Sequence, residues 1–331
     1  MITTASLAAL AQQLTIRDNS TTVTDDSQYG YTPQEGVAIL FLALFGISTV
    51  LHAAQATYFR MWWLFPTAVL CGLGELAGWV GRLWSSQNPE ANTPFIIQIC
   101  CTIIAPTPLL AASFMIMSRM VGRLGTSYSL LTPKWFTILF LPCDLIALVV
   151  QGVGGGMASS ADTLAGANQA CAPRCSFIFV LIFHPVHRAR TLCSEASGFN
   201  SVSVIIIFTA LASDFSLRYI RDKPIRTSGT PRGALTTRLK LMASALAFST
   251  VVLIIRSVYR LIELSGGWEG RVIRTEVYFN VLDGGMVTLA IFTLNFVHPG
   301  MFLQPAPEDV DYAAVKLKSL RNSNDELMSQ T

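Results

Sequence analysis

Leu253-Ile-Ile-Arg256-Ser-Val-Tyr259-Arg260-Leu-Ile-Glu263 places three charged side chains in a segment that is otherwise apolar enough to cross a membrane. Its polar residues occupy positions i, i+3, i+4 and i+7, so on a helix they share one face. A charge near the centre of a bilayer costs about 2.5–3.5 kcal/mol on insertion scales. We therefore expect neighbouring helices or a water-filled cavity to supply partners for this face.

The composition of the chain is typical of a polytopic membrane protein. Of its 331 residues, 52% are hydrophobic and 13% are charged, whereas a soluble domain is nearer to one quarter charged. The first residues lack the basic region of a cleaved signal peptide, so we do not expect one. The sequence contains no nucleotide-binding motif, no hydrolase triad pattern and no Cys-x-x-Cys pair. We therefore predict no enzymatic activity, no cofactor, no bound metal and no nucleic-acid partner.

Apolar runs of membrane length predict the positions of the spans. Six are clear and a seventh, at about 199–217, is poorer; the six lie at about 37–58, 62–84, 95–118, 135–156, 239–262 and 277–298. With seven spans, the Lys and Arg residues after span three, in the loop 218–240 and in the tail all lie on one side, which should be cytoplasmic. The sequence therefore predicts an all-α integral membrane protein, a seven-transmembrane helix bundle with the N-terminus outside and the C-terminus cytoplasmic.

This topology divides the chain into three parts. Residues 1–34 form an exoplasmic N-terminal segment, residues 35–300 the seven-helix transmembrane domain, and residues 301–331 a cytoplasmic tail. Asn19-Ser-Thr is a glycosylation sequon, so an outward N-terminus makes Asn19 a predicted glycosylation site.

Pairs of polar residues seven positions apart recur in four predicted spans: Glu75 with Arg82, Asp144 with Gln151, Arg256 with Glu263, and Glu276 with Asp283. Residues two turns apart share a helix face. In the predicted topology their charges form one layer in the exoplasmic half of the membrane. Five carboxylates and three arginines, Arg260 included, leave an acidic excess that suits a cationic ligand.

The alternative is that these groups pair with one another and fix the helix register. This explanation has the most weight against a ligand-binding role for Arg82, Glu263 and Glu276, which are near the interface. Asp144 and Asp283 are deeper and have no nearby cation in their own helices, which favours a functional role for them. Gly74 and Gly78 form a G-x-x-x-G pattern, which predicts close helix packing.

The chain resembles the fungal RTA-like proteins, the lipid-translocating exporter family. The resemblance covers about 29–168 and 208–300 and rests on an ordered set of short motifs. They are Tyr29-Gly-Tyr-Thr-Pro33, Glu75-Leu-Ala-Gly78-Trp-Val-Gly-Arg82, Ala105-Pro106 with Ala111-Ala-Ser113 and Arg119, Asp144 with Gln151-Gly-Val-Gly-Gly-Gly156, Arg256-Ser-Val-Tyr259-Arg260-Leu-Ile-Glu263, Glu276 with Asp283, and His298-Pro-Gly300.

The resemblance implies seven spans with an outward N-terminus, in fungal plasma or internal membranes. It also implies resistance to, or movement of, amphipathic compounds such as sphingoid long-chain bases, 7-aminocholesterol and porphyrin. We therefore predict a plasma-membrane protein that translocates or exports amphipathic lipids, with membrane lipids and an amphipathic lipid or cationic amphiphile as partners. The predicted ligand-binding residues are Glu75, Asp144, Gln151, Arg256, Tyr259, Arg260, Glu263, Glu276 and Asp283.

An alternative function is that of a seven-helix sensor or receptor for lipid stress without transport activity. Its partner surface would be the basic loop 218–240. This alternative rests on analogy with other seven-helix proteins. The sequence leaves the substrate, the direction of transport, the energy source and the oligomeric state open.

Residues 171–207 depart from the family pattern. Cys171-Ala-Pro-Arg-Cys175 and His184-Pro-Val-His187 stand where a Gly-rich, Gln-containing apolar helix is expected to lead into span five. Two explanations remain open: a translated intron or misplaced exon edge, and a genuine divergent loop.

Overall fold

The computed structural model describes residues 31–133, 196–226, 230, 232–265, 272 and 274–303, with single positions at 135, 138 and 142. Every regular element in this part of the chain is helical. Five helical stretches in it are long and apolar enough to cross a membrane: Glu35–Tyr58, Trp62–Gln87, Asn92–Leu124, Thr237–Glu263 and Glu276–Phe302. The prediction of an all-helical membrane protein is confirmed, and these five stretches cover five of the predicted spans.

Three of the five stretches contain breaks in the regular α-helix. The two stretches without a break are α2 (Glu35–Tyr58) and α10 (Thr237–Ser265). The second stretch joins η1 (Trp62–Leu64), the π-helical η2 (Phe65–Val69) and α3 (Leu70–Gln87). The third joins α4 (Asn92–Ile104) and α5 (Pro106–Leu124), and η3 (Thr126–Tyr128) follows it. The last joins α11 (Glu276–Tyr278), the π-helical η5 (Phe279–Gly285), α12 (Met286–Phe296) and α13 (Pro299–Phe302).

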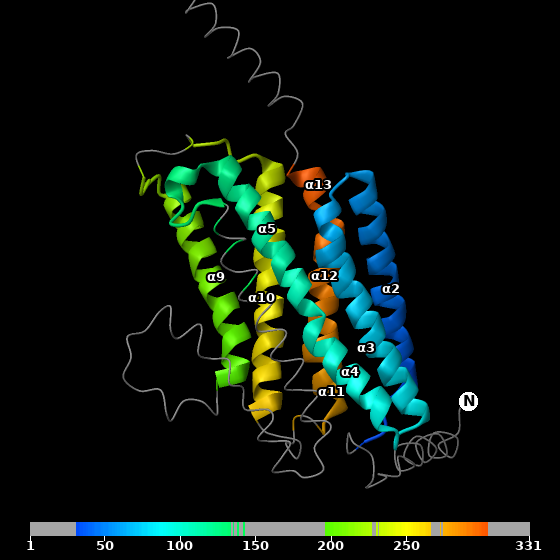
Figure 1. Cartoon of the computed structure of the whole chain (residues 1–331). Coiled ribbons are helices and arrows are strands. Elements are labelled where there is room, and N and C mark those ends of the chain that lie inside the picture. Colours follow the sequence, from blue (N-terminus) through cyan, green and yellow to red (C-terminus); the bar gives the residue numbers. More distant parts are fainter. Residues whose placement is uncertain are drawn as a thin grey trace, which may run out of the picture.

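The helix expected at 199–217 is present as α9 (Ala196–Ile220), so the last part of the irregular segment 171–207 is helical. Figure 1 shows α9 and α10 on one side of the bundle, α2 on the other, and α5 crossing between them. The end of α5 lies beside the end of α9, whereas α9 begins at the opposite end of the bundle. The predicted span at 135–156 lies in the chain between the end of α5 and the start of α9. Apart from single positions, it lies outside the described residues.

The first and last helical stretches run in the same direction. The N–H of Gln34, just before α2, donates a hydrogen bond to Glu276 at the start of α11. At the other end, Gly300 of α13 packs closely against Phe59, which follows α2. The start of α2 and the end of α13 therefore lie at opposite ends of the bundle, as an odd number of crossings requires. The count of seven and the orientation remain predictions.

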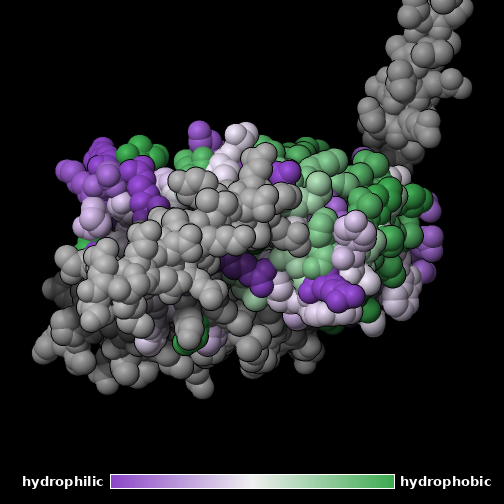
Figure 2. All heavy atoms as spheres, turned by 90° about the horizontal axis from the view of Figure 1, so that it is seen from above, coloured by the Kyte–Doolittle hydropathy of each residue, from purple (hydrophilic) through white to green (hydrophobic). Residues whose placement is uncertain are grey.

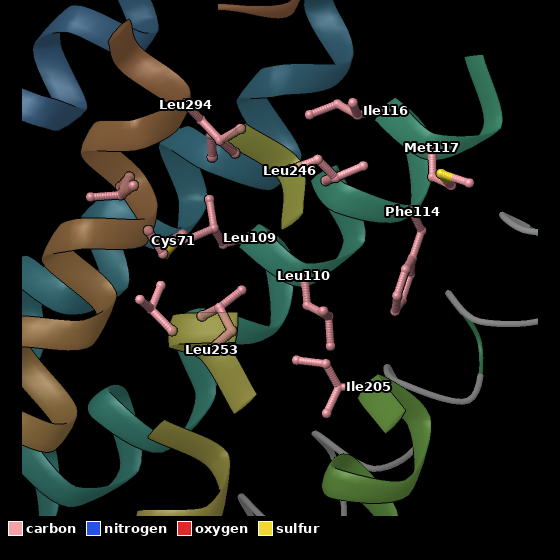
Figure 3. Packing of buried hydrophobic residues seen from close by; sticks show 14 of the residues in the cluster. Cys71, Leu109, Leu110, Phe114, Ile116, Met117, Ile205, Leu246, Leu253 and Leu294 are labelled. Atoms are coloured by element: carbon pink, nitrogen blue, oxygen red, sulfur yellow. The ribbon is translucent and has the colours of Figure 1, made fainter. Parts of the chain in front are cut away.

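Large apolar side chains fill the centre of the bundle around α5. Figure 3 shows Leu109, Leu110 and Phe114 of α5 beside Leu253 of α10 and Ile205 of α9. All five side chains are buried. These contacts pack the first half of α5 against α9 and α10.

The outer face of α2 is apolar and exposed. Only 33% of its most apolar window is buried inside the protein, and Ile39, Ile47 and Val50 are each more than half exposed. A stripe of this kind is costly in water but matches lipid chains in a bilayer. The amount of exposed apolar surface therefore supports a membrane location.

Hydrophilic residues gather where α9 passes into α10, as Figure 2 shows from above. This connection is attached to the end of α5 by hydrogen bonds. The Ser127 carbonyl accepts from the N–H groups of Ile225 and Arg226, and Gly233 N–H donates to the Leu124 carbonyl. The basic loop 218–240 is therefore held against the bundle at its two described parts.

Candidate functional site

The polar face of α10 meets Asp283 of η5. Arg256 Nε donates to Asp283 Oδ1 over 2.8 Å. Arg260 binds both carboxylate oxygens, from Nε to Oδ1 over 3.0 Å and from Nη2 to Oδ2 over 2.7 Å. All three residues are buried, Asp283 to within 1% of full burial. Asp283 has no cation in its own helix, and the neighbouring helix supplies two.

Thr102 of α4 supplies further acceptors for the same arginines. Its carbonyl accepts from Arg256 Nη2, and its hydroxyl accepts from Arg260 Nη2 over 2.8 Å. The carbonyl is available because residue 106, four positions on, is a proline without an N–H group. Pro106 thus breaks the helix between α4 and α5 and leaves a buried carbonyl that Arg256 satisfies.

The predicted G-x-x-x-G packing brings α4 to this position. A Cβ atom added at Gly78 would lie 2.6 Å from Thr102 Cγ2, and one added at Gly74 would lie 2.9 Å from Ala105 Cβ. Contacts that short do not occur between real side chains, so only glycine permits this helix separation. The small residues of α3 therefore place the Thr102 acceptors against α10.

Glu263 completes the polar face of α10. Tyr259 donates its hydroxyl hydrogen to Glu263 Oε1 over 3.0 Å, and Arg260 Nη1 donates to Glu263 Oε2 over 2.7 Å. Tyr259 and Glu263 are both buried. Arg260 therefore joins Glu263 to Asp283 in one continuous ion-pair network.

A second ion pair lies beside this network. Arg82 Nη2 of α3 donates to Glu276 Oε1 and to the Tyr31 hydroxyl, each over 3.1 Å. The Arg82 guanidinium stands over the Phe279 ring at 4.5 Å, and that of Arg260 over the same ring at 5.2 Å. Phe279 therefore links the two ion-pair groups by cation–π contacts. Tyr31 lies before the first span, and burial raises its pKa although Arg82 acts in the opposite direction.

Glu75 of α3 differs from the other carboxylates. It is fully buried, and neither of its oxygens has a hydrogen-bond partner among the described residues. The Trp79 indole N–H is near enough to Glu75 to act as a weak hydrogen-bond donor, but its geometry falls short of a formed hydrogen bond, and Trp79 Nε1 has no other partner among the described residues. Arg256 and Arg260 also act on it from a distance. Their close contacts are with Asp283, so in this part of the chain Glu75 has no counter-ion of its own.

The structure brings together most of the predicted ligand-binding residues. Five form the network of α10 and η5: Arg256, Tyr259, Arg260, Glu263 and Asp283. Glu276 lies next to it with Arg82, and Glu75 of α3 is close enough to Asp283, Arg256 and Arg260 to interact with them electrostatically. Asp144, Gln151 and Asn19 lie outside the described residues. The binding role of the set stays a prediction.

The sequence reasoning missed three contributors. Thr102 has no distinctive pattern except its position four residues before Pro106. Phe279 lies on the face of Glu276 and Asp283, three and four residues away from them, and this spacing was available in the sequence. Tyr31 belongs to a motif that was noted, but nothing in the sequence joins it to Arg82.

Comparisons with known proteins give one consistent result. The chain matches the family model described as RTA1 like protein over residues 68–183 and 199–306. It is 28% identical over 313 residues to the sphingoid long-chain base transporter of Saccharomyces cerevisiae, which covers 90% of this chain and 79% of that protein. It is 26% identical over 315 residues to protoporphyrin uptake protein 1 of the same yeast, covering 83% of this chain and 93% of that protein. No solved structure matches significantly.

The family match is interrupted at one place. Residues 184–198 lie between its two segments, inside the stretch 171–207 where the sequence departs from the family pattern. The departure is therefore confined to a short region, and the matched segment resumes within α9.

Proposed function

The chain belongs to the RTA1-like family, and on that basis we propose that it translocates amphipathic lipids with a cationic head group across a fungal membrane. The proposed location is the plasma membrane. Sphingoid long-chain bases are the proposed substrates. One relative is named as a transporter of these compounds and another as a protoporphyrin uptake protein. The similarity to two proteins named for moving molecules favours transport over a sensor without transport activity.

One observation supports the proposal for the site: among the described residues, each arginine of the charged layer pairs with a carboxylate, whereas the Glu75 carboxylate pairs with no cation. Arg82 pairs with Glu276, and Arg256 and Arg260 pair with Asp283. An ionised carboxylate without a partner loses its hydration on burial, and this costs several kcal/mol. The ammonium group of a sphingoid base would compensate that charge. Glu75 is therefore the proposed contact for the cationic head.

The remaining predicted residues have supporting roles in the proposal. The network of Arg256, Arg260 and Asp283 would fix the helices around Glu75, because each of its members is held by at least two hydrogen bonds. Asp144 and Gln151 would add acceptors from the fourth span. Glu263 and Glu276 would lie nearer to the outer end of the path.

Purified protein in lipid vesicles tests this function. The measurement is the rate at which a fluorescent sphingoid base crosses the bilayer, compared with the same vesicles without protein. We expect wild-type protein to accelerate the crossing, and such movement by purified protein alone would exclude a pure sensor. Glu75→Gln should lower the rate about tenfold or more, since one charge-assisted contact contributes roughly 1.5–3 kcal/mol.

Glu35→Gln is the matched control. Glu35 is an exposed carboxylate in the first turn of α2, and the nearby contact with Glu276 is made by the Gln34 backbone N–H and not by the Glu35 side chain. This variant should move the base at the wild-type rate. Correctly inserted wild-type protein that leaves the crossing rate unchanged would overturn the proposed function.

A further inference from the structure

We propose that Glu75 is also a proton-binding group, and that it releases its proton when a cationic lipid head group arrives. The inference rests on the proposed function and adds to it an exchange of protons for lipid amines. It identifies the energy source that the sequence leaves open, because such an exchange can use a proton gradient across the membrane.

The first argument is that, among the described residues, the two arginines nearest to Glu75 direct their hydrogen bonds to other acceptors. Arg260 uses Nε and Nη2 on Asp283 and Nη1 on Glu263. Arg256 uses Nε on Asp283 and Nη2 on the Thr102 carbonyl. Arg260 cannot bind Glu75 closely without giving up a buried hydrogen bond elsewhere, and both hydrogen bonds of Arg256 hold it on other acceptors. Without ligand, a bound proton is the simplest way to neutralise this carboxylate.

The titratable groups around Glu75 that the structure describes offer no further cation to neutralise it. The charged or titratable residues that act on it or are acted on by it are Cys71 of α3, Cys101 of α4, Arg256 and Arg260 of α10, and Asp283 of η5. On α2, His52 is buried and hydrogen-bonds the Ile291 carbonyl instead. The part of α5 before Arg119 contains no titratable side chain.

The exchange step balances in atoms and charge. The Glu75 carboxylic acid and an ammonium head group R–NH₃⁺ give a carboxylate–ammonium pair and one proton in water. The O–H bond of the acid breaks, its electron pair stays on the carboxylate, and no covalent bond forms to the lipid. The Glu75 site is neutral before the step and neutral after it. Burial therefore favours both states over an empty, ionised carboxylate.

Two consequences follow from this step. Protons and amines compete for one carboxylate, so amine binding weakens as the pH falls. A protein that alternates between the two membrane faces would then carry a proton in one direction for each amine carried in the other. A higher proton concentration outside would drive amines outward.

The test measures proton release on binding. The probe is a C18 trimethylammonium surfactant, whose charge does not change with pH, added to full-length protein in a neutral detergent and weak buffer. We expect wild-type protein to release about one proton per probe bound at a pH where Glu75 is protonated, and the Kd to rise about tenfold per unit fall in pH there. Glu75→Gln should bind more weakly, with no proton release and no such pH dependence.

Control variants separate this role from a structural one. Glu35→Gln should behave like the wild type, and Glu75→Asp, which retains an acid, should still release a proton. If Glu75→Gln does not fold, the wild type and the aspartate variant still decide the question. Probe binding by the wild type at constant affinity without proton release would overturn the inference and leave the proposed function standing. A wild type that neither binds the probe nor moves a sphingoid base would overturn both.

Discussion

Asp283 is the residue on which the charges of α10 depend. It accepts hydrogen bonds from Arg256 and Arg260, and it lies in the π-helical turn η5. Single π-helical turns within α-helices occur frequently at functional sites. Without this carboxylate, the partners of the two buried guanidiniums among the described residues would be Glu263 and the Thr102 acceptors. The arginines are therefore tolerated at this depth because η5 supplies the counter-charge.

We expect Asp283→Asn to destabilise the protein strongly. The change keeps the shape of the side chain but removes its charge, and breaking a buried ion pair in this way costs about 3–5 kcal/mol. Thermal unfolding of the purified protein in detergent measures the effect. Asp214→Asn is the control, because its pair with Arg218 is at the surface, with side chains 34% and 37% exposed. That variant should lose less than about 1 kcal/mol, and equal small losses in both variants would contradict the buried network.

At the scale of elements, the contact between α3 and α4 positions the acceptors for α10. Gly78 lets Thr102 approach α3, and Pro106 leaves the Thr102 carbonyl unbonded within its own helix. Arg256 and Arg260 then use this carbonyl and the neighbouring hydroxyl. The close helix contact at Gly78 and the helix break at Pro106 together position the Thr102 acceptors on one side of the charged site.

We expect Gly78→Val to damage both the fold and the site. Its side chain would overlap Thr102 and force α4 away from α3, which costs about 1–3 kcal/mol for an overpacked interior. The displaced Thr102 would no longer accept from Arg260, so transport of a sphingoid base should fall as well. Both thermal unfolding and the vesicle assay measure the change.

Gly36→Val is the matched control for this variant. A Cβ atom at Gly36 would have no neighbour within 4 Å. It should therefore change stability by less than about 0.5 kcal/mol, as surface substitutions usually do. Normal transport and stability in the Gly78 variant would show that α3 and α4 tolerate a wider separation than the structure has.

At the scale of the whole molecule, the directions of the helices agree with the predicted number of membrane crossings. The first and last helical stretches start at the same end of the bundle, and α5 ends at the opposite end from the start of α9. Both arrangements agree with seven crossings if residues 135–156 cross the membrane once. The positive-inside rule then predicts that the connection between α9 and α10 is cytoplasmic.

Glycosylation of Asn19 tests the predicted orientation. If the N-terminus faces outward, protein made in a fungal host should carry a glycan at Asn19. Removal of the glycan by a glycosidase should increase its mobility on a denaturing gel, and Asn19→Gln should migrate like the deglycosylated protein. An N-terminal epitope tag that antibodies reach only after the cells are permeabilised would contradict this orientation.

Several features were predictable because they depend on local pattern. Apolar runs of membrane length located five helical stretches correctly, since the length of a span is set by the bilayer thickness. The spacing of Arg256, Tyr259, Arg260 and Glu263 placed them on one face, and the structure gives all four buried polar contacts. The G-x-x-x-G pattern predicted a close helix contact, and Gly78 makes one with α4.

The sequence alone determined the helices, their membrane character and the set of residues on their polar faces, because these depend on composition and on a period of 3.6 residues. Only the tertiary structure decided which charges pair. Asp283 has no cation in its own helix, yet α10 gives it two arginines. Glu75 shares its helix with Arg82, yet Arg82 binds Glu276 and Glu75 has no close partner in the described structure. Residues seven apart are separated by about 10 Å along a helix, so ion pairs are formed by the rotation and register of neighbouring helices, which no single helix sequence specifies.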